Sequence, residues 1–197
     1  NGFSKASRMR KARRFADNQK SQRTYIDRYV VVDLETTGLS PKEHEIIEVG
    51  AILVIKGKVE DQYHALIKAK MRIPQAIQSL TGITNEQLYR EGKELLCVLS
   101  ELMEFIGDLP VVSHNVDFDY SFLRTGCERC GLLLFSNPCI DTMVLSRKLV
   151  YDVSNYKLAT LLSYFKIEVN DKHRSITDCL STKKLYEKLI ELQDLQD

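Results

Sequence analysis

A short apolar run that ends on two acidic residues is the feature that most constrains the fold of this chain. Residues 29–34 read Tyr-Val-Val-Val-Asp-Leu, and Glu35 follows them. Apolar, β-branched runs of about four to eight residues are typical of strands buried on both faces of a sheet. Successive side chains of a strand point to opposite faces, so Asp33 and Glu35 share one side while Leu34 points into the core. Two carboxylates on one buried face repel each other unless a cation lies between them, which makes this strand end a candidate metal site.

The same acidic triplet has a plainer interpretation when it is considered alone. A strand that frays at its end leaves its acidic side chains in solvent, and Gly38 would then supply the turn that follows. The Asp-x-Glu pattern by itself leaves both interpretations open, so other residues of the chain have to decide between them.

The order of the remaining patterns predicts an α/β fold. Two apolar runs, residues 46–55 and 59–67, flank Lys56-Gly57-Lys58 and form a predicted hairpin. Downstream, helical and strand patterns alternate, which predicts a mixed sheet with helices on both faces. The further predicted strands are 109–113 and 132–140, and the further predicted helices are 94–106, 117–129, 141–150, 157–164 and a last one from about 175. Ligands of open α/β sheets collect at the carboxyl ends of strands, which is where the acidic pair lies.

The composition indicates a globular protein of a reducing compartment. The 197 residues are 44% hydrophobic and 28% charged, and no apolar run reaches the ~18 residues that span a bilayer. We see no signal peptide, because the basic N-terminus has no apolar segment. The odd number and irregular spacing of the cysteines lead us to expect a cytoplasmic protein. The five cysteines are odd in number, and the Cys127-x-x-Cys130 pair has no second pair to complete a zinc site, so we expect free thiols.

The first 28 residues carry an excess of positive charge. They hold nine Lys or Arg and two Asp, a net charge of +7, which leaves −6 for the rest because the whole chain carries +1. We therefore divide the chain into a basic N-terminal arm or linker, residues 1–28, and one folded domain, residues 29–197. A basic arm on an acidic body favours nucleic acid as a partner, and a solvated tail or linker is the alternative. The chain does not begin with Met, so whether it is a piece of a longer protein stays open.

Two more acidic residues, Asp117 and Asp119, lie at the predicted start of a helix, where Asn115 is well placed as the N-cap. Acidic residues are common at helix starts because they interact favourably with the helix dipole, so either could be purely structural. Residues two positions apart on a helix diverge by about 200°, so at most one of the two can face a metal site.

A final pair, His173 and Asp178, is separated by five residues. On one helix they would diverge by roughly 140°. For both to meet one substrate, His173 must lie in the loop before the last helix and Asp178 in its first turn. The structural alternative is that Ser175-x-x-Asp178 forms a capping box and that the histidine is merely solvated.

Together these stretches resemble the DEDD-type 3′–5′ exonucleases of the histidine-containing branch (DEDDh), in particular the epsilon-type proofreading domain of bacterial DNA polymerase III. The shared motifs are a strand ending in Asp-x-Glu-Thr-Thr-Gly (33–38), His-Asn-x-x-Phe-Asp (114–119) and His-x-x-x-x-Asp (173–178). Segments 73–74, 80–84 and 140–142 are also similar to the family. The resemblance covers residues 28–192 and departs at Ser175, where many relatives carry a small apolar residue.

The resemblance implies an RNase H-like fold with a five-stranded mixed sheet, and it implies a role for each site residue. Four carboxylates would hold two Mg²⁺ or Mn²⁺ ions, with His173 as the general base, and the motif selects Asp119 over Asp117. The implied metal ligands are Asp33, Glu35, Asp119 and Asp178. The implied substrate-binding residues are Thr36, Thr37, Gly38, Leu39, His114 and Asn115, with Leu39 as an apolar wedge against the bases.

The implied reaction is hydrolysis of the terminal phosphodiester at the 3′ end of DNA, with release of nucleoside 5′-monophosphates in proofreading or repair. A polymerase is the implied partner or fusion. One alternative is an exoribonuclease, because discrimination of the 2′-OH depends on the shape of the pocket. The other is a non-catalytic nucleic-acid-binding module, which we expect to lack at least one of the five acidic and histidine residues; all five are present.

Overall fold

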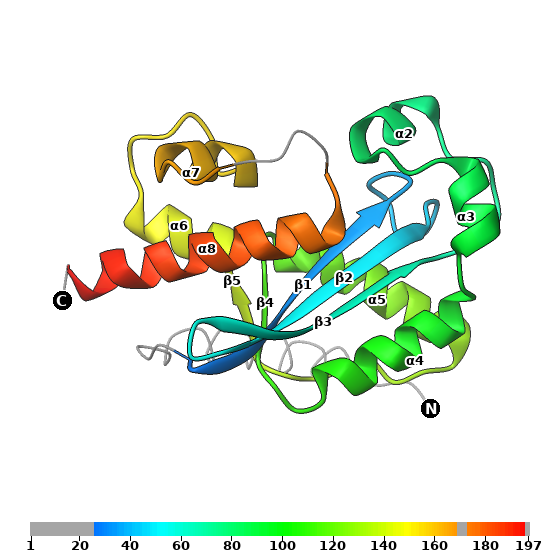
Figure 1. Ribbon diagram of the computed structural model, residues 1–197, viewed down its shortest axis with the longest axis horizontal. Helices are drawn as coiled ribbons and strands as arrows, with labels where there is room; N and C mark the ends of the chain where they lie inside the picture. Colours follow the sequence, from blue (N-terminus) through cyan, green and yellow to red (C-terminus); the bar gives the residue numbers. More distant parts are fainter. Residues whose placement is uncertain (1–25, 169–172, 196–197) are drawn as a thin grey trace, which may run out of the picture.

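A five-stranded mixed sheet organises the chain in the computed structural model, which describes residues 26–168 and 173–195 (Figure 1). The strands follow one another across the sheet in the order β3-β2-β1-β4-β5. Their bounds are β1 (Arg28–Thr36), β2 (Ile46–Ile55), β3 (Lys58–Leu66), β4 (Val111–Ser113) and β5 (Cys139–Asp141). β1 pairs antiparallel with β2 and parallel with β4, and β4 pairs parallel with β5. The carboxyl ends of β1, β4 and β5 therefore meet at one edge of the sheet. Residues 1–25 of the predicted basic arm, 1–28, lie outside the described residues.

Helices cover both faces of the sheet, as the sequence predicts (Figure 1). One face packs against α4 (Leu95–Ile106) and α5 (Val116–Cys130), and the other packs against α8 (Ser175–Asp194). The helices α6 (Thr142–Leu149) and α7 (Leu158–Tyr164) lie beside α8, while α2 (Gln75–Thr81) and α3 (Asn85–Glu91) follow the hairpin. No helix in the described part of the chain is both long and apolar enough to cross a membrane.

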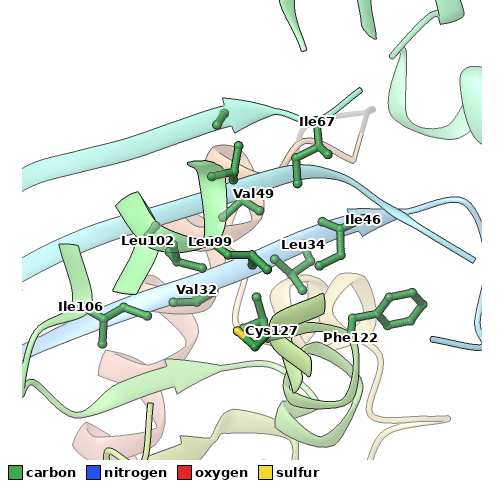
Figure 2. Close-up of a cluster of buried hydrophobic side chains, with 14 of the residues drawn as sticks. Val32, Leu34, Ile46, Val49, Ile67, Leu99, Leu102, Ile106, Phe122 and Cys127 are labelled. Atoms are coloured by element: carbon green, nitrogen blue, oxygen red, sulfur yellow. The ribbon is translucent and has the colours of Figure 1, made fainter. Parts of the chain in front are cut away.

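The central strand β1 is apolar on both sides because each side enters a separate core. Val32 and Leu34 pack with Leu99, Leu102 and Phe122 under α4 and α5 (Figure 2). The alternate residues Tyr29 and Val31 pack with Cys179 and Tyr186 of α8. Asp33 and Glu35 continue this second row, which places them next to the start of α8.

The predicted strand at 132–140 is wrong over most of its length. Only Cys139–Asp141 forms a strand, and residues 132–138 are irregular. The reason is the short partner: β4 has three residues, and Pro110 before it has no N–H to extend the ladder. Asn137 instead donates its side-chain amide to the carbonyls of Gly107 and Leu109, which ties this irregular segment to the end of α4.

Gly50 on β2 lets the start of α8 lie directly on the sheet. A Cβ at this position would lie 2.7 Å from the carbonyl carbon of Ser175 and 2.6 Å from its Oγ. Gly50 is also the residue of β2 that faces Asp33 in the antiparallel register. The close approach therefore brings the first turn of α8 to the acidic end of β1.

We predict that Gly50→Ala pushes the start of α8 away from β1 and β2. Overpacking of this kind costs roughly 1–3 kcal/mol, which urea denaturation measures. Since the backbone of Ser175 cannot rotate away as a flexible side chain would, the substitution also displaces Asp178. Unchanged stability in Gly50→Ala would show that α8 has room to move at this point.

Candidate active site

Four carboxylates converge where β1 ends and where α5 and α8 begin. Asp33 and Glu35 come from β1, Asp119 from the first turn of α5, and Asp178 from the first turn of α8. Each of these carboxyls has a raised pKa. The structure thus brings together the four acidic residues that the sequence motifs select.

Burial and mutual repulsion make these carboxylates costly to ionise. Burial raises the pKa of Asp33 well above its usual value, and the charges of Asp119, Glu35 and Asp178 raise it further. Burial, followed by the charge of Asp178, raises the pKa of Glu35 to about 8. Burial likewise raises the pKa of Asp119 to about 7, although the hydrogen bond from Ser113 opposes this shift.

The site fits a divalent cation on the evidence of its own atoms. Oδ2 of Asp33 is closed off from solvent and has no hydrogen-bond partner among the described residues. Carboxylate oxygens of Glu35 and Asp178 lie within 4.8 Å of each other and of a ring nitrogen of His173. Carboxylate oxygens are the donors that hard cations such as Mg²⁺ prefer. A bound cation would be the partner that Oδ2 of Asp33 lacks.

The helix α5 separates its two acidic residues in the way the helical period predicts. Asp119 is 6% exposed, and its carboxylate accepts hydrogen bonds from the hydroxyl of Ser113 and the backbone N–H of Leu34. Asp117 is exposed to solvent. Only Asp119 therefore faces the other carboxylates.

His173 lies in the loop before α8, as the five-residue spacing requires. Its ring Nδ1 is 3.0 Å from Oδ2 of Asp178, and its backbone N–H donates to the carbonyl of Leu80 on α2. The capping box considered as an alternative does not form: Arg174 occupies the N-cap position without a side-chain cap, and Ser175 Oγ is buried with no partner in the described chain. The imidazole consequently reaches the carboxylate side of the site.

The loop that carries His173 is held by Glu48, a residue that sequence reasoning missed. Glu48 is fully buried on β2, and its Oε1 accepts from Nε and Nη2 of Arg174 at 2.8 and 2.6 Å. Its Oε2 accepts from the backbone N–H of Ser175 at 2.8 Å, and His64 lies 2.7 Å from Oε1. The available signal was a lone acidic residue inside the apolar run 46–55, which needs a buried partner.

The ionised form of Glu48 is the one that these contacts favour. Burial opposes ionisation, but the hydrogen bonds from His64, Arg174 and Ser175 outweigh it and lower the pKa of Glu48 to about 2. Because the folded pKa lies below the usual value, the stabilisation is present above about pH 4.5 and is lost as the pH falls towards 2.

We predict that Glu48→Gln leaves Arg174 without its counter-charge and lowers the free energy of unfolding. Breaking a fully buried pair costs about 3–5 kcal/mol, and we expect roughly 2–3 because Arg174 and His64 reach solvent. Denaturation at pH 7 and at pH 3 measures the effect. The loss of stability between these two pH values should be smaller in Glu48→Gln than in the parent, and an equal loss would contradict the role assigned to this carboxylate.

A second network fixes the turn between β4 and α5. Asn115 has the left-handed conformation, with φ of 68°, and lies at the N-cap position without the predicted side-chain cap. Asp141 supplies acceptors instead: its carboxylate takes the backbone N–H groups of Asn115 and Val116, and it also caps α6. His114 bonds to Thr142 Oγ1 and to the carbonyl of Tyr156, which ties the turn to α6 and to the segment before α7.

An open cleft of about 660 Å³ lies beside the carboxylates. Of the predicted substrate-binding residues, Thr37 does not line the cleft and bonds to the backbone of Glu45 instead. The other five line it together with Glu35 and His173: Thr36, Gly38, Leu39, His114 and Asn115. Leu39 is 83% exposed at the cleft, where an apolar contact with a base would have to lie.

Comparison with known proteins is consistent with this arrangement. A protein-family model described as "Exonuclease" (RNase_T) matches residues 30–186. The chain belongs to this exonuclease family. The match includes every one of the four carboxylates and His173.

Curated relatives carry the description "DNA polymerase III PolC-type". The chain is 36% identical to that of Caldanaerobacter subterraneus subsp. tengcongensis over 168 residues and 40% identical to that of Latilactobacillus sakei subsp. sakei over 161 residues. These alignments cover 85% and 82% of this chain but only 12% and 11% of the relatives. The chain thus spans about an eighth of the length of the curated relatives it matches.

Solved structures of exonucleases share the fold. A structure of exonuclease I superimposes with a TM-score of 0.74 at 18% identity, covering 86% of this chain and 43% of the other. Exonuclease X in complex with 5′ overhanging duplex DNA superimposes with a TM-score of 0.62 at 23% identity, covering 85% and 92%. The RNase H-like fold with a five-stranded mixed sheet is therefore confirmed.

We predict that the charge of Asp33 destabilises the metal-free protein. Its raised pKa means that folding disfavours the ionised form, so Asp33→Asn should raise Tm in EDTA by roughly 2–4 °C for each kcal/mol relieved. Mg²⁺ should stabilise the parent by ~2.7 kcal/mol at a hundred-fold excess over Kd. This gain should be lost in Asp33→Asn, and a gain of the same size in both proteins would place the cation elsewhere.

Proposed function

We propose that this chain is a divalent-metal-dependent exonuclease that removes nucleoside 5′-monophosphates from the 3′ end of DNA. The observation that carries the proposal is the convergence of four carboxylates and one imidazole beside an open cleft. Membership of the exonuclease family supports hydrolysis of phosphodiesters. The polarity and the DNA substrate are our inference from the DEDDh motifs and from the names of the relatives.

The carboxylates of the site are suited to hold Mg²⁺ or Mn²⁺. The proposed ligands are Asp33, Glu35, Asp119 and Asp178. Bound ions would supply positive charge to the phosphodiester during its hydrolysis. With cations bound, the site as a whole would attract the phosphate backbone that its carboxylates alone repel.

His173 is the proposed general base. Its Nδ1 lies within hydrogen-bond distance of Asp178 Oδ2. When Nδ1 donates to this carboxylate, Nε2 carries the free lone pair and can take a proton from the attacking water. Asp178 then has a second role, because it fixes the orientation of the imidazole.

The residues at the cleft are suited to hold a 3′-terminal nucleotide. We propose that Thr36 and Gly38 contact its sugar and phosphate, and that Leu39 packs against its base. His114 and Asn115 face the adjoining part of the strand. This assignment rests on their positions around the cleft and on the family motifs.

A polymerase is the proposed context of this activity. The PolC-type relatives are described as DNA polymerase III, and the chain matches a small part of each of them. An exonuclease unit that works beside a polymerase would remove misincorporated nucleotides from the primer end. We therefore propose proofreading as the biological role.

The direction of digestion is tested with a single-stranded DNA oligonucleotide labelled at one end. We predict that, with Mg²⁺, a 3′ label is released at once as mononucleotide, while a 5′ label gives a ladder of shortening products. EDTA should abolish both. Immediate release of the 5′ label, or full activity in EDTA, would overturn the proposed function.

The same assay distinguishes the acidic residues of α5. Asp119→Asn should lower kcat by more than the ~10–100-fold that is typical of residues in the outer shell of a metal site. Asp117→Asn is the matched control, because its carboxyl is exposed two positions away on the same helix, and it should stay within a few-fold of the parent. The reverse pattern would reject Asp119 as a ligand.

A further inference from the structure

One wall of the cleft carries two cationic side chains that the proposed reaction does not use. Arg147 of α6 and Lys157 at the start of α7 line the same cleft as Glu35 and His173. Both are exposed. Neither forms an ion pair with any residue in ranges 26–168 and 173–195. Their charges are therefore available to a ligand in the cleft.

The Arg147 side chain is held in place by an aromatic platform. Its guanidinium carbon lies 5.7 Å from the centre of the Tyr156 ring. Tyr156 is itself fixed at two points, because its hydroxyl donates to the carbonyl of Val150 and its own carbonyl is 2.9 Å from His114 Nε2. A guanidinium stacked on a fixed ring loses less freedom when it binds and presents its N–H groups as a fork.

The backbone at Lys157 is fixed as well. Asn155 Oδ1 accepts from the backbone N–H of Lys157 at 3.0 Å and from Thr160 Oγ1 at 2.8 Å. The segment 155–157 therefore keeps a defined position at the start of α7. Lys157 contributes a flexible charge beside the oriented guanidinium of Arg147.

Arg147 acts on His114 at the β4–α5 turn, whereas a different cation acts on Glu35. The cation that lowers the pKa of Glu35 is Arg174. Burial lowers the pKa of His114, and the charge of Arg147 adds to this effect. Arg147 lies near the β4–α5 turn, because its guanidinium is over the Tyr156 ring and the Tyr156 carbonyl is 2.9 Å from His114 Nε2. This is next to where the adjoining nucleotide is proposed to lie.

From this geometry we propose that Arg147 and Lys157 bind the internucleotide phosphate on the 5′ side of the scissile one. The inference rests on the proposed function and adds a subsite to it. A guanidinium binds a phosphodiester through two charge-assisted hydrogen bonds, and an ammonium adds a point charge. Contacts of this kind position a strand without reading its sequence. The cleft would then hold the terminal nucleotide at its acidic wall and the next phosphate at its basic wall.

The proposal is tested by comparing two substrates that differ in this phosphate. The p-nitrophenyl ester of thymidine 5′-monophosphate contains the reacting phosphodiester and no second phosphate. A 3′-labelled oligothymidylate contains both. The variants are Arg147→Gln, Lys157→Gln and the double substitution, with Lys148→Gln as the control because Lys148 is the exposed neighbour of Arg147 on α6 and does not line the cleft.

We predict that each single variant raises KM for the oligonucleotide roughly three- to ten-fold and flattens the dependence of log KM on log salt by up to ~0.7 per lost phosphate contact. Turnover of the nitrophenyl ester should stay within two-fold of the parent. Arg147→Lys, which keeps the charge, should recover part of the oligonucleotide affinity. Lys148→Gln should match the parent on both substrates.

Two outcomes would overturn the subsite. An equal loss on both substrates would mean that Arg147 acts on the scissile phosphate or supports His114 through Tyr156. No loss on the oligonucleotide would mean that both cations are solvated surface charges. A parent protein that cleaves neither substrate would instead reject the proposed function, so the two failures are distinguishable.

Discussion

The crowding of four carboxylates, two of them buried and two half-buried, is the constraint on which the rest of this structure depends. Burial raises the pKa of all four carboxyls, and the charges of the neighbouring carboxylates raise the pKa of Asp33 and Glu35 further. An arrangement of this kind lowers the stability of the metal-free chain, so other contacts must hold the carboxylates in position. The apolar strand β1 does most of this, because the residues before Asp33 are buried in two separate cores.

Polar contacts near the site also help to hold the carboxylates in position, in addition to the two apolar cores. The hydroxyl of Ser113, at the end of β4, donates to Asp119. Asp141, at the end of β5, accepts the first N–H groups of the turn into α5. Glu48, on β2, accepts from the side chain of Arg174 and the backbone of Ser175. Each of these links joins a strand to the start of α5 or α8, and the links of Asp141 and Glu48 connect segments far apart in the sequence, so the sheet fixes the positions of both helix starts.

The sequence was informative where short-range periodicity decides the outcome. The alternation of Asp33, Leu34 and Glu35 along β1 and the five-residue offset of His173 from Asp178 both follow from strand and helix geometry. The choice between Asp117 and Asp119 needed the family motif. The sequence-based prediction failed where the structure of a segment depends on a partner far away in the chain. The strand expected at 132–140 is short because β4, with which it pairs, has only three residues. The role of Glu48 was not predicted because Arg174 and Ser175, which it holds, lie more than a hundred residues away in the sequence.

The position of the cations follows from the same electrostatic constraint. An arginine free to reach Glu35 or Asp178 would pair with these carboxylates and compete with a divalent ion for them. Arg174 is the arginine whose charge acts on Glu35. Glu48, which faces Glu35 across β1 and β2, binds Nε and Nη2 of Arg174 through its Oε1. Arg147 and Lys157 do not pair with these carboxylates, because they lie on the α6–α7 wall of the cleft. A nuclease cleft of this design separates the charges that hold metal from the charges that hold the phosphate backbone, and Glu48 keeps that separation intact where the two come closest.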